Sequence, residues 1–589
     1  MKSVKTEDVF QKSYNKHPNK PFRILLGMYK GSYHKLIMAT LCYIVKHSPV
    51  WIMPIVTANI INTVTGQVAN SSDIILNNAI VIAVLILFNI PMNYLHVHFR
   101  SSSFRSVEAG LRSALVRKIQ QLSIPYHKEM QSGRLQSKII RDVEAVETLS
   151  SQMFVSFLNI IINIAVALAV TAFKNKVVFV FFLLTVPVAA ITIVVFRNRI
   201  KEQNHKFRNK IEDTSARVME MVDMIPVTRA HGLEDIEVKN MDIQVSQVAE
   251  EGYRLDIIQA NFGAVSWAVF QLFQVFCLVF TGILALRGRI PAGDIVLYQT
   301  YFASVVNQVS SLVTLFPTMS KGMESINSIG EILNVHDVED HTGLKIDDLL
   351  GNYEFNNVSF AYDKKHPILQ GLNMKVNQGE TIAIVGESGA GKSTILNMVI
   401  GFILPNEGDL LIDGHNIKEI DLHHYRKHIS VVPQESILFS GSIRDNITYG
   451  LTNVTERELE EAIEAASLRD LIDSLPEGLD TNIGEHGDKL SGGQRQRISI
   501  ARALIRDPKI IIFDEATSAL DSVSEKQILN ALENLAKGRT TFVVAHRLST
   551  IKKADKIAVI KNGVCSEIGT YDELIALKGE FYKMKVIQS

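Results

Sequence analysis

A glycine-rich run follows a short apolar stretch in the second half of the chain. The stretch Thr381-Ile382-Ala383-Ile384-Val385 predicts a buried strand, and an apolar helical pattern comes after the run. This order is the context that a phosphate-binding loop requires, because glycines let backbone N–H groups surround the phosphates. Lys392 is expected to reach the β- and γ-phosphates of a nucleotide, and Ser393 to offer its hydroxyl to Mg²⁺. The predicted loop consists of Gly386, Glu387, Ser388, Gly389, Ala390, Gly391, Lys392, Ser393 and Thr394.

Two acidic residues follow another apolar run. Ile510-Ile511-Ile512-Phe513 predicts a fully buried strand, and Asp514 and Glu515 come directly after it. Because parallel strands end at one edge of their sheet, both carboxylates are expected near the phosphate loop. Asp514 suits the coordination shell of Mg²⁺, and Glu515 suits polarising the water that attacks the γ-phosphorus. A solvated turn is the alternative interpretation, and the neighbouring motifs make it the weaker one.

A serine–glycine run lies between these two motifs. Ser491, Gly492, Gly493 and Gln494 follow Leu490 and precede a polar, basic stretch. The serine and the glycines are expected to open a helix. A helix N-terminus has unpaired N–H groups and a partial positive charge, and both suit a phosphate. The run therefore predicts a second element that faces a nucleotide.

The composition differs between the two halves of the chain. The 589 residues are too many for one core, and long apolar runs fill the first half, whereas the second half reads as a soluble α/β domain. A formal net charge of +0 leaves no basic surplus for nucleic acid, which argues against a nucleic-acid partner. Cys42, Cys277 and Cys565 lack CxxC spacing and are expected to be free thiols. Residues 1–35 are polar, so no removable signal peptide is expected.

The apolar runs are long enough to predict six membrane spans. The long segments between spans two and three and between spans four and five are basic, whereas the connection between the first two spans has no Lys or Arg. The positive-inside rule places both long segments in the cytoplasm, and an even number of spans places both termini there too. The predicted spans are Leu36–Ile60, Ile74–His96, Phe154–Phe173, Val177–Phe196, Ala260–Leu286 and Ile295–Leu315.

Each long cytoplasmic segment is predicted to extend the spans as helices and to contain one break. Apolar residues repeat at helical spacing on either side of the breaks. Pro125 and Gly133 interrupt the first segment, and Pro226 and Gly232 interrupt the second. Each break is either a simple loop or, as the flanking helices favour, a short transverse helix that touches the α/β domain.

Lys46 is the charged residue that lies well inside a predicted span. An ammonium there is costly unless it faces a cavity or a partner, and no Asp or Glu occurs in any span core. Two interpretations carry equal weight: Lys46 lines a cavity and meets an anionic or polar group of a substrate, or it snorkels without touching substrate. His96 and His98 have metal-like spacing but no third ligand, so no metal is expected there. The intramembrane amides are interpreted as hydrogen-bonding residues between helices: Gln271, Gln274, Gln299, Asn307 and Gln308.

Taken in order, these motifs resemble those of the ATP-binding cassette (ABC) exporter family, and the resemblance covers residues 1–589 as one half-transporter. It implies a multi-domain membrane protein, with an all-α transmembrane domain of six helices and an α/β P-loop nucleotide-binding domain that carries a helical subdomain. It also implies roles for further residues: Tyr362 stacks on adenine, Gln434 senses Mg²⁺ and the attacking water, Gly484-Glu485 contacts the membrane domain, Ser518-Ala519-Leu520-Asp521 forms the D-loop, and His546 binds the γ-phosphate.

The resemblance also implies a domain layout. An N-terminal segment at 1–35 precedes a transmembrane domain at 36–325, a linker at 326–350 and a nucleotide-binding domain at 351–589. The breaks near Pro125–Met130 and Ile225–Leu233 would be coupling helices, the second docking on the opposite subunit. The expected location is a bacterial cytoplasmic membrane, with the nucleotide-binding domain in the cytoplasm.

The implied activity is ATP hydrolysis with Mg²⁺ that drives export of a drug-like, lipid or peptide amphiphile by alternating access. In the family, the serine–glycine run faces ATP held by the other subunit, which implies a dimer. Glu515 and the run Leu490–Gln494 are both intact, which favours a homodimer over one half of a heterodimer. An exporter-like importer, for example for siderophores, stays open. The intact motifs argue against a mere ATP-binding channel, and the spans exclude a soluble ATPase acting on DNA.

Overall fold

The chain forms two compact units, each described here by itself. The helical unit comprises Met1–Gln120 and Gln131–His336, and the sheet unit comprises Gln121–Met130 and Asp337–Ser589. The sheet unit is therefore discontinuous in sequence. The computed structural model describes residues 6–17, 20–66, 71–130, 132–339, 342–363, 366–514, 522–544 and 551–588.

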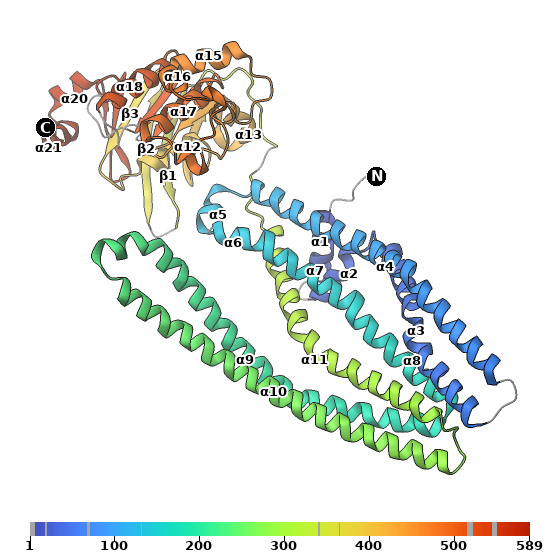
Figure 1. Cartoon of the computed structure of the whole chain (residues 1–589). Coiled ribbons are helices and arrows are strands. Elements are labelled where there is room, and N and C mark those ends of the chain that lie inside the picture. The colour runs from blue at the N-terminus through green and yellow to red at the C-terminus, as the bar shows by residue number, and fades with distance from the viewer. Residues whose placement is uncertain are drawn as a thin grey trace. The chain divides into compact units, whose positions relative to one another are not determined.

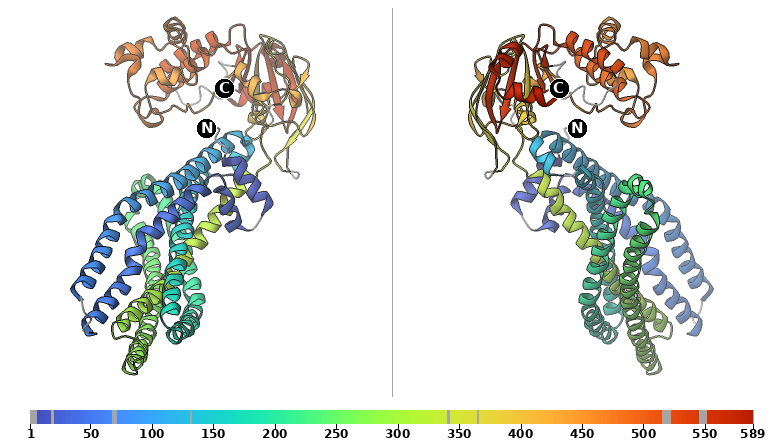
Figure 2. Two further views of the ribbon diagram at one scale, coloured as in Figure 1. Left: turned by 90° about the vertical axis from the view of Figure 1, so that its right-hand side faces the viewer. Right: turned by 90° about the vertical axis from the view of Figure 1, so that its left-hand side faces the viewer.

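The helical unit is built from long helices that run beside one another (Figures 1 and 2). Two π-helical segments, Lys138–Asp142 and Gln152–Phe157, join α6, α7 and α8 into one continuous helical stretch. Each predicted span lies inside its own helical stretch. The helices are α1 (Thr6–Lys16), α2 (Pro21–Met28), α3 (Tyr33–Thr65), α4 (Ser71–Gln121), α6 (Ser132–Ser137), α7 (Val143–Ser151), α8 (Leu158–Lys174), α9 (Lys176–His231), α10 (Glu234–Leu286) and α11 (Asp294–Leu333).

Several of these helices carry a surface that suits a lipid bilayer. Among the described residues, four helical stretches are long and apolar enough to cross a membrane: Tyr33–Thr65, Ser71–Gln121, Leu135–Lys174 and Glu234–Leu286. Large apolar side chains on α4 are open to the surroundings, with Leu87 67% and Ile90 69% exposed. Such apolar exposure is costly in water and favourable against lipid tails.

The interior of the helical unit is an apolar and aromatic cluster. Phe182 of α9 packs edge-on against Phe302 of α11 at a centroid distance of 5.4 Å. Cys277 of α10 is fully buried in the same cluster. Hydrophobic contact thus helps to hold α9, α10 and α11 together.

The second predicted break differs from the expectation. Helix α9 passes through Pro226 without interruption and ends at His231, and α10 begins at Glu234. Gly232 takes a left-handed conformation with φ of 64°, and the N–H of Leu233 donates to the carbonyl of Thr228 at 3.0 Å. This glycine C-cap reverses the chain within two residues, so the described residues form a tight turn there rather than a separate transverse helix.

The sheet unit contains two β-sheets. An antiparallel sheet has the order β2-β1-β4-β5, and a larger sheet has the order β10-β9-β3-β8-β7-β6, in which all neighbours except β10 and β9 are parallel. The strands are β1 (Tyr353–Ala361), β2 (Pro367–Val376), β3 (Thr381–Gly386), β4 (Glu407–Ile412), β5 (His415–Asn416), β6 (Ile429–Val432), β7 (Ile510–Asp514), β8 (Thr540–Val544), β9 (Lys556–Lys561) and β10 (Val564–Gly569).

Helices cover the larger sheet and complete the sheet unit. Strands β3, β7 and β8 are buried along nearly their whole length and consist mostly of apolar residues, which is typical of strands covered on both faces. Burial raises the pKa of the Cys565 thiol to about 11, and all three cysteines are free, as predicted. The helices are α5 (Ile124–Glu129), α12 (Lys392–Val399), α13 (Leu422–Tyr425), α14 (Ile443–Ile447), α15 (Glu456–Ala465), α16 (Arg469–Ser474), α17 (Gly492–Leu504), α18 (Ser522–Ala536), α20 (Tyr571–Leu577) and α21 (Glu580–Gln588).

Candidate active site

The predicted phosphate loop connects β3 to α12. Gly389 and Gly391 have φ values of 81° and 102°, a conformation that residues with a Cβ rarely adopt. A Cβ on Gly391 would also lie 2.8 Å from a side-chain carbon of Leu369. Lys392 begins α12, and its Nζ donates to the carbonyls of Gly386 and Glu387, both at 2.9 Å. The lysine is thus folded over the loop, where an incoming phosphate would meet it.

The strand register places Asp514 beside this loop. Ile384 of β3 and Asp514 of β7 both pair with Val544 of β8, so β3 and β7 reach the same edge of the sheet. Gly386 lies two residues beyond Ile384, at that edge. The predicted base Glu515, the D-loop residues Ser518 to Asp521 and His546 lie outside the described residues. Glu515 comes directly after Asp514, and His546 comes two positions after the last residue of β8.

The serine–glycine run opens helix α17. Ser491 is its N-cap: the hydroxyl accepts from the N–H of Gln494 at 3.3 Å, and Gln494 Oε1 accepts from the N–H of Ser491 at 2.8 Å. This capping box fixes the first turn. Ser491 and Gly492 are exposed, and a Cβ on Gly492 would meet nothing within 4 Å. The N-terminus of α17 is therefore preorganised and open.

Tyr362 and Gln434 lie at strand ends on the two sheets. Tyr362 follows β1, is 51% exposed and packs edge-on against Phe360 at 4.9 Å. Phe360 pairs with Leu369, whose side chain approaches Gly391, so the strand that leads to Tyr362 pairs with a strand that lies beside the phosphate loop. Gln434 is exposed two residues after the end of β6, beside β7. Gly484 precedes a 3₁₀ turn in which Glu485 is exposed.

Two polar residues on α17, the buried Gln496 and the half-buried Arg502, escaped the sequence analysis. Gln496 Nε2 donates to the carbonyl of Pro433 at 3.3 Å, next to Gln434, and Gln496 also bonds to Ser436. Arg502 donates to the carbonyls of Asn446 at 2.8 Å and Ile437 at 2.9 Å. Together they attach α17 to the segment after β6. Little in the sequence signals these two residues, because the same helix also buries the polar Arg497 and Ser499.

A second unforeseen feature is the anchor of the linker after α11, which lies entirely within the sheet unit. Residues 121–123 pair with residues 337–339: Leu122 and Val338 form a β-bridge, and the N–H of Glu339 donates to the carbonyl of Gln121 at 3.0 Å. The carboxylate of Glu339 accepts two bonds from Arg426, at 2.7 and 2.9 Å. Arg426 also donates to the carbonyls of Ile400 at 3.1 Å and Gly401 at 2.6 Å, just after α12.

This anchor predicts measurable coupling between Arg426 and Glu339. Their side chains are only 23% and 16% exposed. In a double-mutant cycle on thermal unfolding, Arg426→Ala and Glu339→Ala are expected to show a coupling free energy of about 1 kcal/mol or more. The exposed Arg457–Glu461 pair is the matched control, expected to show less than about 0.5 kcal/mol. Additive effects of Arg426→Ala and Glu339→Ala would contradict the anchor.

Comparison with known proteins identifies the family. Residues 369–518 match the family model for ABC transporter, and residues 36–309 match the model for ABC transporter transmembrane region. The "Putative multidrug export ATP-binding/permease protein YgaD" of Bacillus subtilis (strain 168) is 33% identical over 95% of this chain and 97% of its own length. This chain belongs to the ABC transporter family.

Two further similarities agree with this family assignment. The "ATP-dependent lipid A-core flippase" of Desulfotalea psychrophila (strain LSv54 / DSM 12343) is 34% identical over 81% of this chain and 84% of its own length. The solved structure titled "Structure of a bacterial Atm1-family ABC exporter with ATP bound" has a TM-score of 0.82 and 25% identity, and covers 95% of this chain and 98% of that one. The exporter-type fold predicted from the motifs is confirmed.

The ABC transporter is therefore an ATP-hydrolysing, multi-pass membrane protein. It fuses one membrane domain and one nucleotide-binding domain in a single chain, which is the organisation of a half-transporter.

Proposed function

We propose that this ABC transporter works as a homodimer that exports an amphipathic compound by alternating access. The observation that carries the proposal is the open N-terminus of α17. Ser491 and Gly492 are exposed and shaped for an anion, and they lie on a different helix from the phosphate loop at the start of α12. A nucleotide held by one subunit's loop can thus be covered by the other subunit's α17.

The proposed roles extend to residues at the sheet edge and to residues that follow its strands in sequence. The loop from Gly386 to Thr394 binds the phosphates, and Lys392 exchanges its bonds to loop carbonyls for bonds to phosphate oxygens. Tyr362 stacks on adenine. Glu515 accepts the proton of the attacking water, with Gln434 and His546 placing the water and the γ-phosphate. Asp521, together with Ser491 to Gln494, completes the site from the second subunit.

A magnesium ion fits the donor atoms at this edge. Ser393 is exposed in the first turn of α12, Asp514 ends β7, and Gln434 lies two residues after the neighbouring strand β6. Hydroxyl, carboxylate and amide oxygens are the ligands that Mg²⁺ prefers. The bound ion would neutralise charge on the β- and γ-phosphates. The protein residues hold the ion and orient the water.

Coupling to transport requires that ATP bind the closed dimer better than the open one, because a ligand shifts an equilibrium only by its differential affinity. Closure would then turn a cavity of the membrane domains outward, and hydrolysis would reset the dimer. We place the nucleotide-binding domains in the cytoplasm of a bacterium, because both long basic segments, including the turn between α9 and α10, belong on that side.

Inside-out vesicles test the proposal. ATP-dependent uptake of a fluorescent lipophilic cation and of a tail-labelled phospholipid is compared for the wild type and Glu515→Gln. We expect uptake of at least one probe by the wild type and none by the variant. ATP-driven loss of a preloaded probe from the vesicles would contradict export and indicate an importer. Wild-type ATP hydrolysis without movement of either probe would contradict an amphipathic substrate of these classes.

A further inference from the structure

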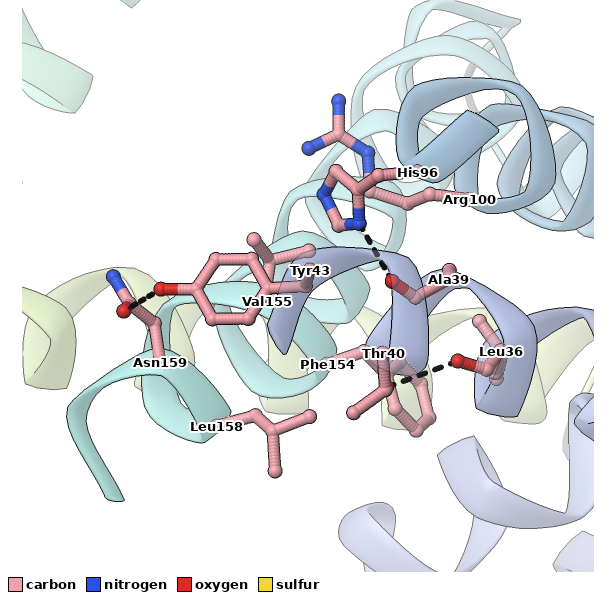
Figure 3. A pocket seen from close by; sticks show the side chains of 10 residues that line it. All are labelled: Leu36, Ala39, Thr40, Tyr43, His96, Arg100, Phe154, Val155, Leu158 and Asn159. Atoms are coloured by element: carbon pink, nitrogen blue, oxygen red, sulfur yellow. Dashed lines mark hydrogen bonds between the residues drawn. The ribbon is translucent and has the colours of Figure 1, made fainter. Parts of the chain in front are cut away.

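A pocket lies among α3, α4 and the helical stretch that ends with α8, all within the helical unit (Figure 3). The enclosed space is small, about 40 Å³, and it opens to the surroundings. Tyr43, His96, Arg100 and Asn159 provide the polar lining, and Phe154 forms part of the apolar wall. The combination of apolar walls with a few polar groups is typical of small-molecule sites.

Most polar groups of this pocket already have partners. His96 is buried, and its Nδ1 donates to the carbonyl of Ala39 at 2.9 Å. The hydroxyl of Tyr43 bonds to the amide oxygen of Asn159. Figure 3 shows both bonds spanning from one helix to another. These groups therefore shape the pocket, and the positive charge in its lining comes from Arg100.

Arg100 is half-buried without an anion. Within the part of the chain that the structure describes, its guanidinium forms no hydrogen bond or ion pair, and the side chain lies beside His96 (Figure 3). The nearest acid along α4 in the direction of its C-terminus, Glu108, is already held by Arg105 at 2.6 Å and Arg112 at 2.9 Å. A desolvated guanidinium with free donors favours a carboxylate or phosphate partner.

Lys46 adds a second positive charge to the same region. It lies three residues after Tyr43 on α3, is half-buried, and forms no ion pair within the described residues. Because neither of the first two predicted spans contains an acid, nothing within them offsets these cations.

The pocket also lies at the depth of a lipid head group. The first predicted span begins at Leu36 and the second ends at His96, so the pocket lies where both spans leave the apolar layer on the proposed cytoplasmic side. Next to it the surface is apolar and open: Ile37 is 59%, Leu41 51% and Tyr94 69% exposed. An acyl tail would find contact there while its head group stays at the pocket.

We propose that this pocket receives the anionic head group of an amphiphilic substrate that enters from the cytoplasmic leaflet. Arg100 binds the phosphate or carboxylate, Lys46 adds long-range attraction, and the tail lies along the apolar surface of α3 and α4. The proposal rests on the proposed export function and narrows its substrate class to anionic amphiphiles.

The test uses the full chain in phosphatidylcholine vesicles that contain either tail-labelled phosphatidylglycerol or phosphatidylcholine with the same labelled tail. ATP-dependent movement of each label between leaflets is measured together with ATP hydrolysis. The wild type is expected to move the anionic lipid about tenfold faster, because one charge-assisted hydrogen bond accounts for that selectivity. Arg100→Gln is expected to abolish the preference while basal hydrolysis persists, and Lys46→Gln to reduce it. Arg100→Lys should keep part of it.

Arg117→Gln is the matched control, since Arg117 is exposed on the same helix and outside the pocket. An unchanged preference in Arg100→Gln would overturn the proposal. The proposal would also be overturned if phosphatidylglycerol stimulated ATP hydrolysis in the wild type but not in Arg100→Gln, while the label did not move. That result would indicate a resident lipid. If the wild type moves only the neutral lipid, export stands and the anionic class fails. If the wild type hydrolyses ATP, moves neither label and takes up neither probe into inside-out vesicles, the export function itself fails.

Discussion

Replacing Glu515 with Gln is expected to lower ATP hydrolysis by about 10²- to 10⁴-fold, because glutamine keeps the size of the side chain but cannot accept a proton from water. Asp514 ends β7 level with Ile384 of β3, at the edge where the phosphate loop begins, and Glu515 is the next residue in the sequence. ATP binding should persist, since the loop and Lys392 are unchanged. Phosphate release and nucleotide affinity of the purified chain check both parts.

Two comparisons make this result specific. Lys392→Ala should lose ATP binding as well as hydrolysis, because the ammonium that lies over the loop is gone. Glu461→Gln removes an acid from the exposed Arg457 pair on α15 and should leave the rate unchanged. Retention of more than about a tenth of the wild-type rate by Glu515→Gln would show that another group acts as the base.

The second large effect is expected for Ser491→Arg. The bulky side chain would fill the open N-terminus of α17, where Gly492 leaves free space, and hydrolysis should fall by about 10²-fold or more through loss of aligned donors. Binding of ATP to the same subunit's phosphate loop should remain, because in the proposed dimer α17 serves the nucleotide of the partner. Thr455→Arg, at the capping box of α15, controls for the loss of a helix cap alone.

The proposed arrangement across two subunits also predicts complementation. In a mixed dimer of Lys392→Ala and Ser491→Arg chains, both defects fall on one nucleotide site and the other site is intact. Co-expressed, differently tagged chains purified through both tags should therefore recover hydrolysis that neither variant shows alone. Equal inactivity of the mixed and single-variant dimers would contradict the proposal that one complete composite site suffices for hydrolysis.

The fold was predictable wherever one local pattern determined the outcome. Apolar length located the spans, and a buried strand followed by glycines located the loop that begins α12. Ser491 with Gln494 three residues later is a capping box, so the start of α17 was evident as well. These signals are local because helix caps and tight loops are stabilised by neighbours in sequence.

Non-local contacts were not predictable. The linker around Glu339 contacts residues 121–123 and Arg426, which are far away along the chain. No spacing rule in the sequence encodes such pairing. The exact position of the turn at Gly232 was not predictable, because helix propensities rank proline as a stronger helix breaker than glycine. In the structure, α9 nevertheless continues through Pro226 and ends just before Gly232. Arg100 looked like one of several basic residues until the structure placed it beside a pocket without an acid.

The discontinuity of the sheet unit has a consequence for gene design. A chimera that joined the membrane helices of this chain to the ATPase of a relative at a single junction near residue 337 would combine a native 121–123 segment with a foreign partner for Leu122 and Ser123. The two pieces form one structural module although the gene separates them. Functional exchange of motors between relatives should therefore require two grafts, residues 121–130 together with everything from residue 337 onward.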